Sequence, residues 1–404
     1  MLKYIRYAWL LLPAIPYLYI STQHATNLPI LDDYEAVLGT CINWNNGNWL
    51  EKIGVLFRQH NEHRLVSSHL VYVLYYSVFG DINFRNLILL GNLNLLVACA
   101  FMVYFIKKTA VKYWQVPAFI AVLLMADLNT YESGSITEYT WQNNGVLMLF
   151  FLTLYLWDRK KMVPAIIAQF FLIFSSGNGM IGVCFIAIYC LGLGRKYFIA
   201  CTASMAAFIG LYFIGYTTFE DKTKTPFDIN KVITYFVRET GAPFSFDNSF
   251  LYGLLILVAV ASLFPFKTIR SSLTTQPLYA ILLWALASMS TTALFRSCTT
   301  YAQFQTSRYL IYPQLLIAVL LVLMMIKKKK AWNVISYVVM ALWVCVYYPY
   351  NFKFGEAGFE RFEYRVMYVH GVLGDRYWHP EKEKAAQIAQ AADAQGIYSI
   401  NDNR

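Results

Sequence analysis

Apolar residues form long continuous runs separated by short polar segments, and they do not alternate with polar residues as in membrane β-strands. A backbone in lipid must satisfy its hydrogen bonds internally, so continuous apolar runs predict membrane-spanning helices. We therefore predict an all-α polytopic membrane protein. After a first apolar helix near the N-terminus, the runs cover residues 87–106, 116–126, 145–157, 162–174, 180–193, 197–216, 250–266, 278–294, 309–326 and 332–348.

Basic turns follow every second run, which indicates the orientation of the chain. Lys and Arg collect in cytoplasmic loops, so these turns are assigned to the cytoplasm. The parity holds only if the short apolar run 65–79 lies along the outer surface as an interfacial or re-entrant helix. The pattern then predicts about eleven spans, with the N-terminus in the cytoplasm and the C-terminus outside. The basic turns lie at residues 107–112, 159–161, 195–196, 267–270 and 327–330.

Composition supports this class. Of the 404 residues, 58% are hydrophobic and 14% charged, which is too apolar for a soluble domain of this length. The net charge of +10 reflects cytoplasmic loops and gives no reason to expect a nucleic-acid partner. Neither a P-loop nor a Gly-rich dinucleotide turn occurs, which argues against cytosolic nucleotide donors.

Two parts are expected. Residues 1–349 form the transmembrane part, including a polar first outer loop at 21–64, and residues 350–404 form an outer tail. Pro380 and Gly396 bracket a segment, 381–395, with strong helix propensity. Its apolar face is poor, and the sequence leaves open whether it packs on the outer loops or binds an acceptor.

The predicted orientation places two acidic sets on the outer face. Asp32 and Asp33 end the first helix, either as a solvated helix end or as a general base whose pKa is raised by partial desolvation. Glu132 and Glu138 lie in a second outer loop. Paired carboxylates from separate loops suit deprotonation of a hydroxyl or binding of a divalent cation, and the sequence does not decide whether a metal is needed.

Cationic residues on the same face predict an anionic ligand. Arg64 follows Glu62 and His63, a group that forms a local ion pair or orients a substrate, with Arg64 on a phosphate and Glu62 or His63 on sugar hydroxyls. Arg308 precedes Tyr309 at the mouth of a span, where it either snorkels to the interface or holds an anion. Further outer cations, which the positive-inside rule disfavours there, are Lys222, Lys224, Lys231, Arg238 and Arg296.

Three other features carry weaker predictions. Trp141, Gln142 and Tyr301 are either interfacial or part of a sugar platform. The sequence SSGNG at 175–179 breaks an apolar region, and we interpret it as a tight hairpin rather than a broken helix aimed at a ligand. The outer compartment permits a disulfide between Cys41 and Cys298.

Taken together, the order of these motifs resembles the bacterial GT-C glycosyltransferases that modify O-antigen, lipopolysaccharide or other surface glycans. The matching features are DDYEA, EHR, the stretch from Glu132 to Gln142, SSGNG, and SRY before a span. The resemblance implies a GT-C-like fold and inverting transfer from a polyprenyl-phosphate (undecaprenyl) sugar to a hydroxyl. It also implies that Asp32 or Asp33 is the base and that Arg308, helped by Arg64, holds the donor phosphate.

The expected setting is the bacterial inner membrane with a periplasmic active site. Its partners would be the lipid-linked donor, a glycan or lipid-linked glycan acceptor, and membrane lipids. Two other functions stay open. A polymerase of lipid-linked repeats would give a ladder of products, and a transporter or flippase would need substrate groups near the membrane midplane, where these runs hold almost no charge.

Overall fold

The structure is a computed structural model that describes residues 7–109, 111–218, 225–263, 276–299, 307–326, 330–371 and 379–399. It is almost entirely helical, and five of its helical segments are long and apolar enough to cross a membrane. The all-α prediction is therefore confirmed, and the apolar helices indicate membrane association. The five segments are α6 (Phe84–Lys108), α13 (Arg195–Phe213), α17 (Pro277–Arg296), Ser307–Ile326 with α18 (Ile311–Ile326), and Lys330–Tyr368, which begins with α19 (Lys330–Leu342).

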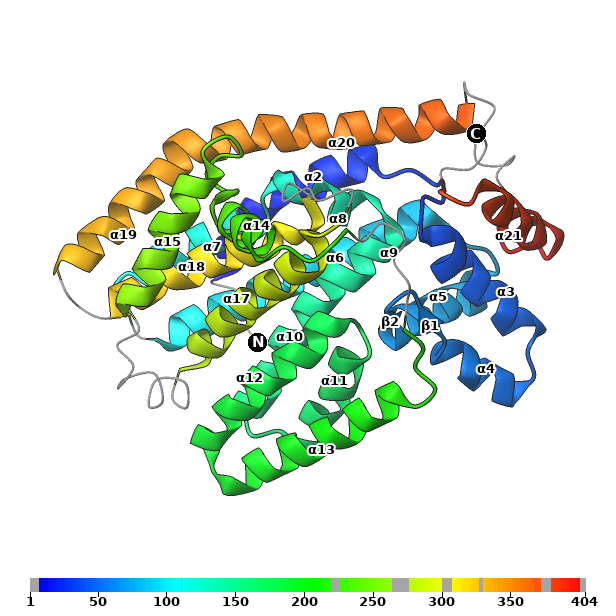
Figure 1. Cartoon of the computed structure of the whole chain (residues 1–404), viewed down its shortest axis with the longest axis horizontal. Coiled ribbons are helices and arrows are strands. Elements are labelled where there is room, and N and C mark those ends of the chain that lie inside the picture. Colours follow the sequence, from blue (N-terminus) through cyan, green and yellow to red (C-terminus); the bar gives the residue numbers. More distant parts are fainter. Residues whose placement is uncertain are drawn as a thin grey trace.

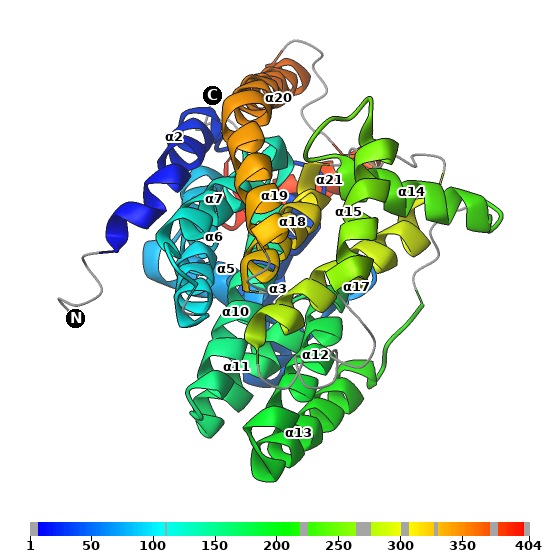
Figure 2. The same cartoon turned by 90° about the vertical axis from the view of Figure 1, so that its left-hand side faces the viewer.

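Shorter helices occupy the remaining predicted runs. They pack side by side with the long helices, and the stacked rings of Phe150 and Trp284 (centroids 3.8 Å apart) lie in the core. Figures 1 and 2 show α10 to α13 forming the lower part of the molecule, opposite the last long helix. The shorter helices are α2 (Ile15–His24, preceded by a 3-10 helix at Ala8–Ala14), α7 (Gln115–Met125), α10 (Gly145–Asp158), α11 (Met162–Ile173), α12 (Gly177–Leu193) and α15 (Ser249–Leu263).

The SSGNG segment forms a tight turn between α11 and α12, which pack on each other. Gly179 approaches the preceding helix so closely that a Cβ there would lie 1.9 Å from the carbonyl oxygen of Leu172. The hairpin interpretation is therefore confirmed, and it depends on glycine at this position.

The first outer loop is folded rather than a simple connector. A π-helical turn (Tyr34–Leu38) leads into α3 (Gly39–Asn46) and α4 (Trp49–Leu56), and Asn48 and Glu51 form a capping box at the start of α4. A short hairpin of β1 (Gln59–His60) and β2 (His63–Arg64) follows, with His60 paired to His63. The run predicted at 65–79 is helix α5 (Val66–Phe79), which packs on α3 and α4.

The C-terminal part holds more helix than predicted. After a π-helical turn (Trp343–Tyr347), α20 (Tyr348–Gly371) extends along the top of Figure 1. Asn351 fastens it by donating to Asp127 Oδ2 (3.1 Å). The helix predicted at 381–395 is confirmed as α21 (Lys382–Ala394), but its supposedly poor apolar face was misjudged. Its buried alanines pack closely with the first outer loop and with Tyr398, so the helix does pack on an outer loop.

Three short helices also lie in the predicted outer segments. The α8 (Tyr131–Ser135) and α9 (Thr137–Tyr139) helices form the second outer loop and join a π-helical turn (Thr140–Asn144). The α14 helix (Ile229–Gly241) was not predicted, because its charged residues hide its apolar stripe. Asp228 caps α14, and Gly253 lets α15 approach it closely.

The disulfide that the sequence permits between Cys41 and Cys298 is not formed. All seven cysteines are free, and both Cys41 and Cys298 are buried. Cys41 packs among the apolar side chains that join the first outer loop to α21, whereas Cys298 lies beside the backbone of Asp228. The two thiols are therefore small packing residues in separate environments.

The turn at Gly179 gives a stability prediction. Gly179→Ala should lower the melting temperature of the purified protein, because the new methyl group meets backbone and overpacking costs about 1–3 kcal/mol or more. Gly54→Ala is the control, since a Cβ there meets nothing within 4 Å and alanine favours helix by about 0.5–1 kcal/mol. Equal melting temperatures for Gly179→Ala and wild type would contradict the turn geometry.

Candidate active site

The outer loops bring most of the predicted site residues to one region. The first outer loop, the β1–β2 hairpin, α8 and α9, the end of α17 and the turn before α18 all contribute, although they lie far apart in the sequence. Electrostatic coupling links these groups, because the pKa of Asp32 responds to Arg308 and that of His63 responds to Asp32 and Arg296. The residues are Asp32, Asp33, His60, Glu62, His63, Glu132, Glu138, Tyr139, Arg296, Arg308 and Tyr309.

Asp33 is fully buried and joins two loops. Its Oδ1 accepts the backbone N–H of Glu138 (2.9 Å) and its Oδ2 accepts that of Ile30 (3.2 Å). Burial raises the pKa of Asp33 to about 7, although these hydrogen bonds oppose the shift. Its carboxyl group thus holds the first outer loop against the second, and no side of it faces a ligand.

Asp32 differs from its neighbour because its side chain is 33% exposed. The Nε2 atom of His60 lies 3.7 Å from its Oδ1. Burial pushes the pKa of Asp32 upward, but the nearby imidazole of His60, followed by the charges of Arg308 and His379, outweighs burial and lowers it. Asp32 is therefore an accessible carboxylate that stays ionised at neutral pH.

Glu138 lies beneath this pair and is buried. Tyr72 of α5 donates to its Oε2 (2.8 Å), while its Oε1 has no hydrogen-bond partner among the described residues. Burial raises the pKa of Glu138 to about 8, against the opposing effects of His60 and Tyr72. Glu138 is therefore largely protonated near neutral pH, and Tyr72 occupies one of its two oxygens.

Arg308 supplies a positive charge without a carboxylate partner in the described part of the chain. Its guanidinium lies 4.2 Å from the ring centre of Tyr139 and 5.1 Å from that of Tyr309. The backbone is fixed to α8, because Arg308 N–H donates to Glu132 Oε2 (3.3 Å) and Glu132 N–H donates to Ser307 Oγ (2.9 Å). A rigidly held guanidinium stacked on aromatic rings is suited to an anion.

A second cation comes from the end of α17. Arg296 Nη2 lies 3.1 Å from Glu62 Oε1, and His63 Nε2 lies 3.7 Å from the same oxygen. Arg296 and Glu62 are 37% and 39% exposed, so the pair contributes little to stability. It leaves guanidinium and carboxylate groups partly exposed at the rim of the site.

Two residues predicted to bind a ligand also make contacts within the protein. Arg64 donates to the carbonyl oxygens of Phe57 (2.8 Å) and Ile214 (2.6 Å), so its guanidinium ties the hairpin to the end of α13, while its buried Nε has no hydrogen-bond partner among the described residues. The indole of Trp141 donates to the carbonyl of Leu87 (3.0 Å) and packs against α6. Gln142 is partly buried beside it, and Tyr301 lies outside the described residues.

The sequence assigns no individual role to His60 or His379. His60 could have been found from the hairpin, because pairing with His63 places it next to the acidic loop. His379 lies in the tail, where its ring contacts Tyr34 (centroids 6.0 Å apart), and nothing local signals that contact. Within the described ranges, no group of three or more His, Cys, Asp or Glu side chains is arranged to hold a metal ion.

Comparison with known proteins does not identify relatives. No protein-family model matches the chain, and no curated protein matches it with significant similarity. The site geometry therefore carries the functional argument.

The buried Glu138 gives a pH prediction. The pKa of Glu138 is about 8 in the folded protein, compared with 4.5 in the unfolded chain. The contribution of Glu138 to the free energy of unfolding is therefore complete below pH 4.5 and is lost as the pH rises through about 8. The melting temperature of wild type should therefore fall between pH 6 and pH 9, and Glu138→Gln should show a smaller fall. The exposed Glu383→Gln should follow wild type, and a Glu138→Gln curve parallel to wild type would contradict the assignment.

Proposed function

We propose that the protein is a membrane glycosyltransferase that moves a sugar from a polyprenyl phosphate to an acceptor hydroxyl at the outer face of the bacterial inner membrane. The observation that carries this proposal is an accessible, ionised carboxylate at Asp32 within electrostatic reach of the Arg308 guanidinium, which has no carboxylate partner in the described residues. A transfer with an anionic leaving group needs these two elements, a base and a cationic clamp.

Asp32 is the general base in this mechanism. Its carboxylate takes the proton of the acceptor hydroxyl while the hydroxyl oxygen attacks the anomeric carbon from the face opposite the phosphate. The bond between that carbon and the phosphate oxygen breaks, its electron pair stays on the lipid phosphate, and the configuration inverts. The charges around Asp32 keep it deprotonated, and Asp33 is left to position the loop.

Arg308 stabilises the departing phosphate. Its guanidinium lies against the rings of Tyr139 and Tyr309, and its backbone N–H is held by Glu132 of α8. Arg296 adds positive charge at the exposed rim, where its pairing with Glu62 is weak enough to exchange for a ligand. Glu132, predicted as a catalytic carboxylate, acts here by holding the Arg308 backbone.

The proposed orientation in the membrane follows from the distribution of basic turns in the sequence. We infer about eleven spans, with basic turns in the cytoplasm and both acidic loops outside. The packing of α5 on α3 and α4, which are outer-loop helices in this topology, supports its interfacial placement. The basic turns at 267–270 and 327–329 lie outside the described residues. The donor lipid would approach from the outer leaflet, next to Arg308 at the mouth of the α18 span.

Asp32→Asn should lower kcat for transfer by about 10²–10⁴-fold, the usual contribution of a general base, because the amide cannot take a proton. The assay uses purified protein in nanodiscs, radiolabelled polyprenyl-phosphate sugars and cell-envelope glycans. KM for the donor and the melting temperature should stay unchanged. The exposed Asp81→Asn is the control. Full activity of Asp32→Asn would refute the base assignment, and a ladder of products would instead indicate a polymerase.

Arg308→Ala should raise KM for the donor by about 10–100-fold, which corresponds to loss of a charged hydrogen bond. Arg308→Lys should give an intermediate value, because lysine keeps the charge but loses the planar fork and the aromatic stacking. Donor titrations of the three proteins measure this order. An activity loss in Arg308→Ala without any change in donor KM would remove Arg308 from the phosphate.

A further inference from the structure

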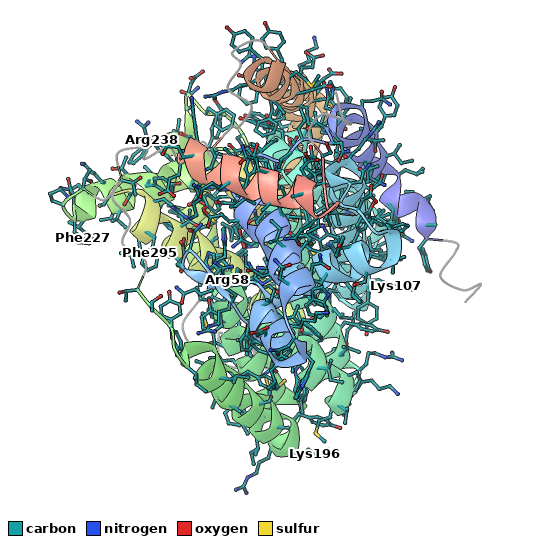
Figure 3. The ribbon with its side chains drawn as sticks, turned by 90° about the vertical axis from the view of Figure 1, so that its right-hand side faces the viewer. Arg58, Lys107, Lys196, Phe227, Arg238 and Phe295 are labelled. Carbon is teal, nitrogen blue, oxygen red and sulfur yellow. The ribbon has the colours of Figure 1, made fainter. Side chains whose placement is uncertain are left out.

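A polar cleft of about 380 Å³ lies between the first outer loop and the C-terminal helix α21, beyond the catalytic groups described above. Its volume falls within the range of small-ligand sites, about 300–1,000 Å³. Figure 3 shows α21 crossing the upper end of the blue helices, where α3 lies, with Arg58 beside them. The side chains that define the cleft are Glu35, Asn43, Arg58, His60, Lys384 and Gln387.

The sequence of α21 divides its two faces between core and cleft. Ala385, Ala389 and Ala392 are buried against the first outer loop and its neighbours. Lys384 and Gln387, three positions apart and thus on one helix face, line the cleft. Asn45 further fastens the helix by donating to Gln395 Oε1 (3.1 Å). The cleft therefore exists only because the tail docks onto the loop.

The groups in the cleft suit a hydroxylated ligand that carries a negative charge. Lys384 and Glu35 form an ion pair (2.5 Å) and largely cancel each other. Arg58 is exposed and forms no ion pair with any described residue, which leaves one positive charge at the wall. The amides of Asn43 and Gln387 offer both donors and acceptors for sugar hydroxyls.

His60 connects this cleft to the candidate base. Its ring lines the cleft and its Nε2 lies 3.7 Å from Asp32 Oδ1. Arg308 influences Asp32 from the other loops, so Asp32 stands between a cationic site and the cleft.

We propose that the cleft between α3, the β1–β2 hairpin and α21 binds the acceptor, and that this acceptor is an acidic oligosaccharide whose carboxylate or phosphate meets Arg58. That the bound oligosaccharide is the acceptor of the transfer rests on the proposed function. Its binding to the cleft does not require catalysis. It also gives the C-terminal helix α21 a specific task, since its Gln387 and Lys384 form one wall of the site.

The binding test uses saturation-transfer NMR on the full-length protein in lipid nanodiscs, free of sugar detergents. The probes are matched oligosaccharides, neutral, uronate-bearing and phosphorylated. Gln387→Trp fills the cleft, whereas Gln390→Trp places the same bulk on the exposed side of α21, away from the lining. We expect the acidic probes to give the stronger signal with wild type and Gln390→Trp, and at least a fivefold loss with Gln387→Trp.

Arg58→Ala separates charge from shape. It should bring the acidic probes down to the signal of the neutral probes and leave the neutral signal unchanged. No signal from any probe with wild type, or equal signals from Gln387→Trp and Gln390→Trp, would overturn the cleft as the binding site. An unchanged preference for acidic probes in Arg58→Ala would overturn the charge assignment. If the probes bind as expected but no sugar is transferred in the donor assay, only the proposed function fails.

Discussion

The carboxyl group of Asp33 connects backbone segments that are 105 residues apart in the sequence. By accepting the N–H groups of Ile30 and Glu138, it fixes the segment before the π-helical turn (Tyr34–Leu38) against the second outer loop. A buried carboxyl is costly unless its hydrogen bonds are made, so this bridge holds both segments in a single arrangement. Asp32, the next residue, is thereby held at the surface beside His60.

This arrangement gives adjacent acidic residues opposite properties. The same burial that raises the pKa of Asp33 is outweighed at Asp32 by nearby positive charge. Burial also raises the pKa of Glu138, whose carboxyl group accepts a hydrogen bond from Tyr72. Protonation of these buried carboxyl groups reduces the repulsion that several nearby anions would cause.

Much of the fold follows from the sequence, because lipid-facing helices reveal themselves as apolar runs. Helices α10 and α11 coincide with their runs almost to the residue, and the SSGNG turn was predicted from glycine alone. Helix α14 was missed because its charged residues hide its apolar stripe, and the alanine face of α21 was missed because its packing partners are distant in sequence. The alanines of α21 allow the first outer loop to pack closely on the helix. In the sequence alone, they form only a weakly apolar face.

The candidate site was predicted in outline but not in its division of roles. Sequence placed Asp32, Glu138 and Arg308 on one face, yet it could not tell Asp32 from Asp33, because the difference is one of burial. It assigned Arg64 to a ligand without showing that two backbone carbonyls accept hydrogen bonds from that guanidinium. Charged side chains can be found in a sequence, but the groups that hydrogen-bond to them in the folded protein cannot.

The proposed mechanism requires Asp32 and Arg308 to lie on opposite sides of a lipid-linked sugar. A cryo-EM structure of the protein in nanodiscs with a polyprenyl-phosphate sugar tests this placement directly. The mechanism predicts the phosphate within hydrogen-bonding distance of the Arg308 guanidinium and the sugar between that phosphate and the Asp32 carboxylate. A phosphate bound at the basic turns at the other ends of the helices, with the space between Asp32 and Arg308 filled only by lipid or water, would contradict it.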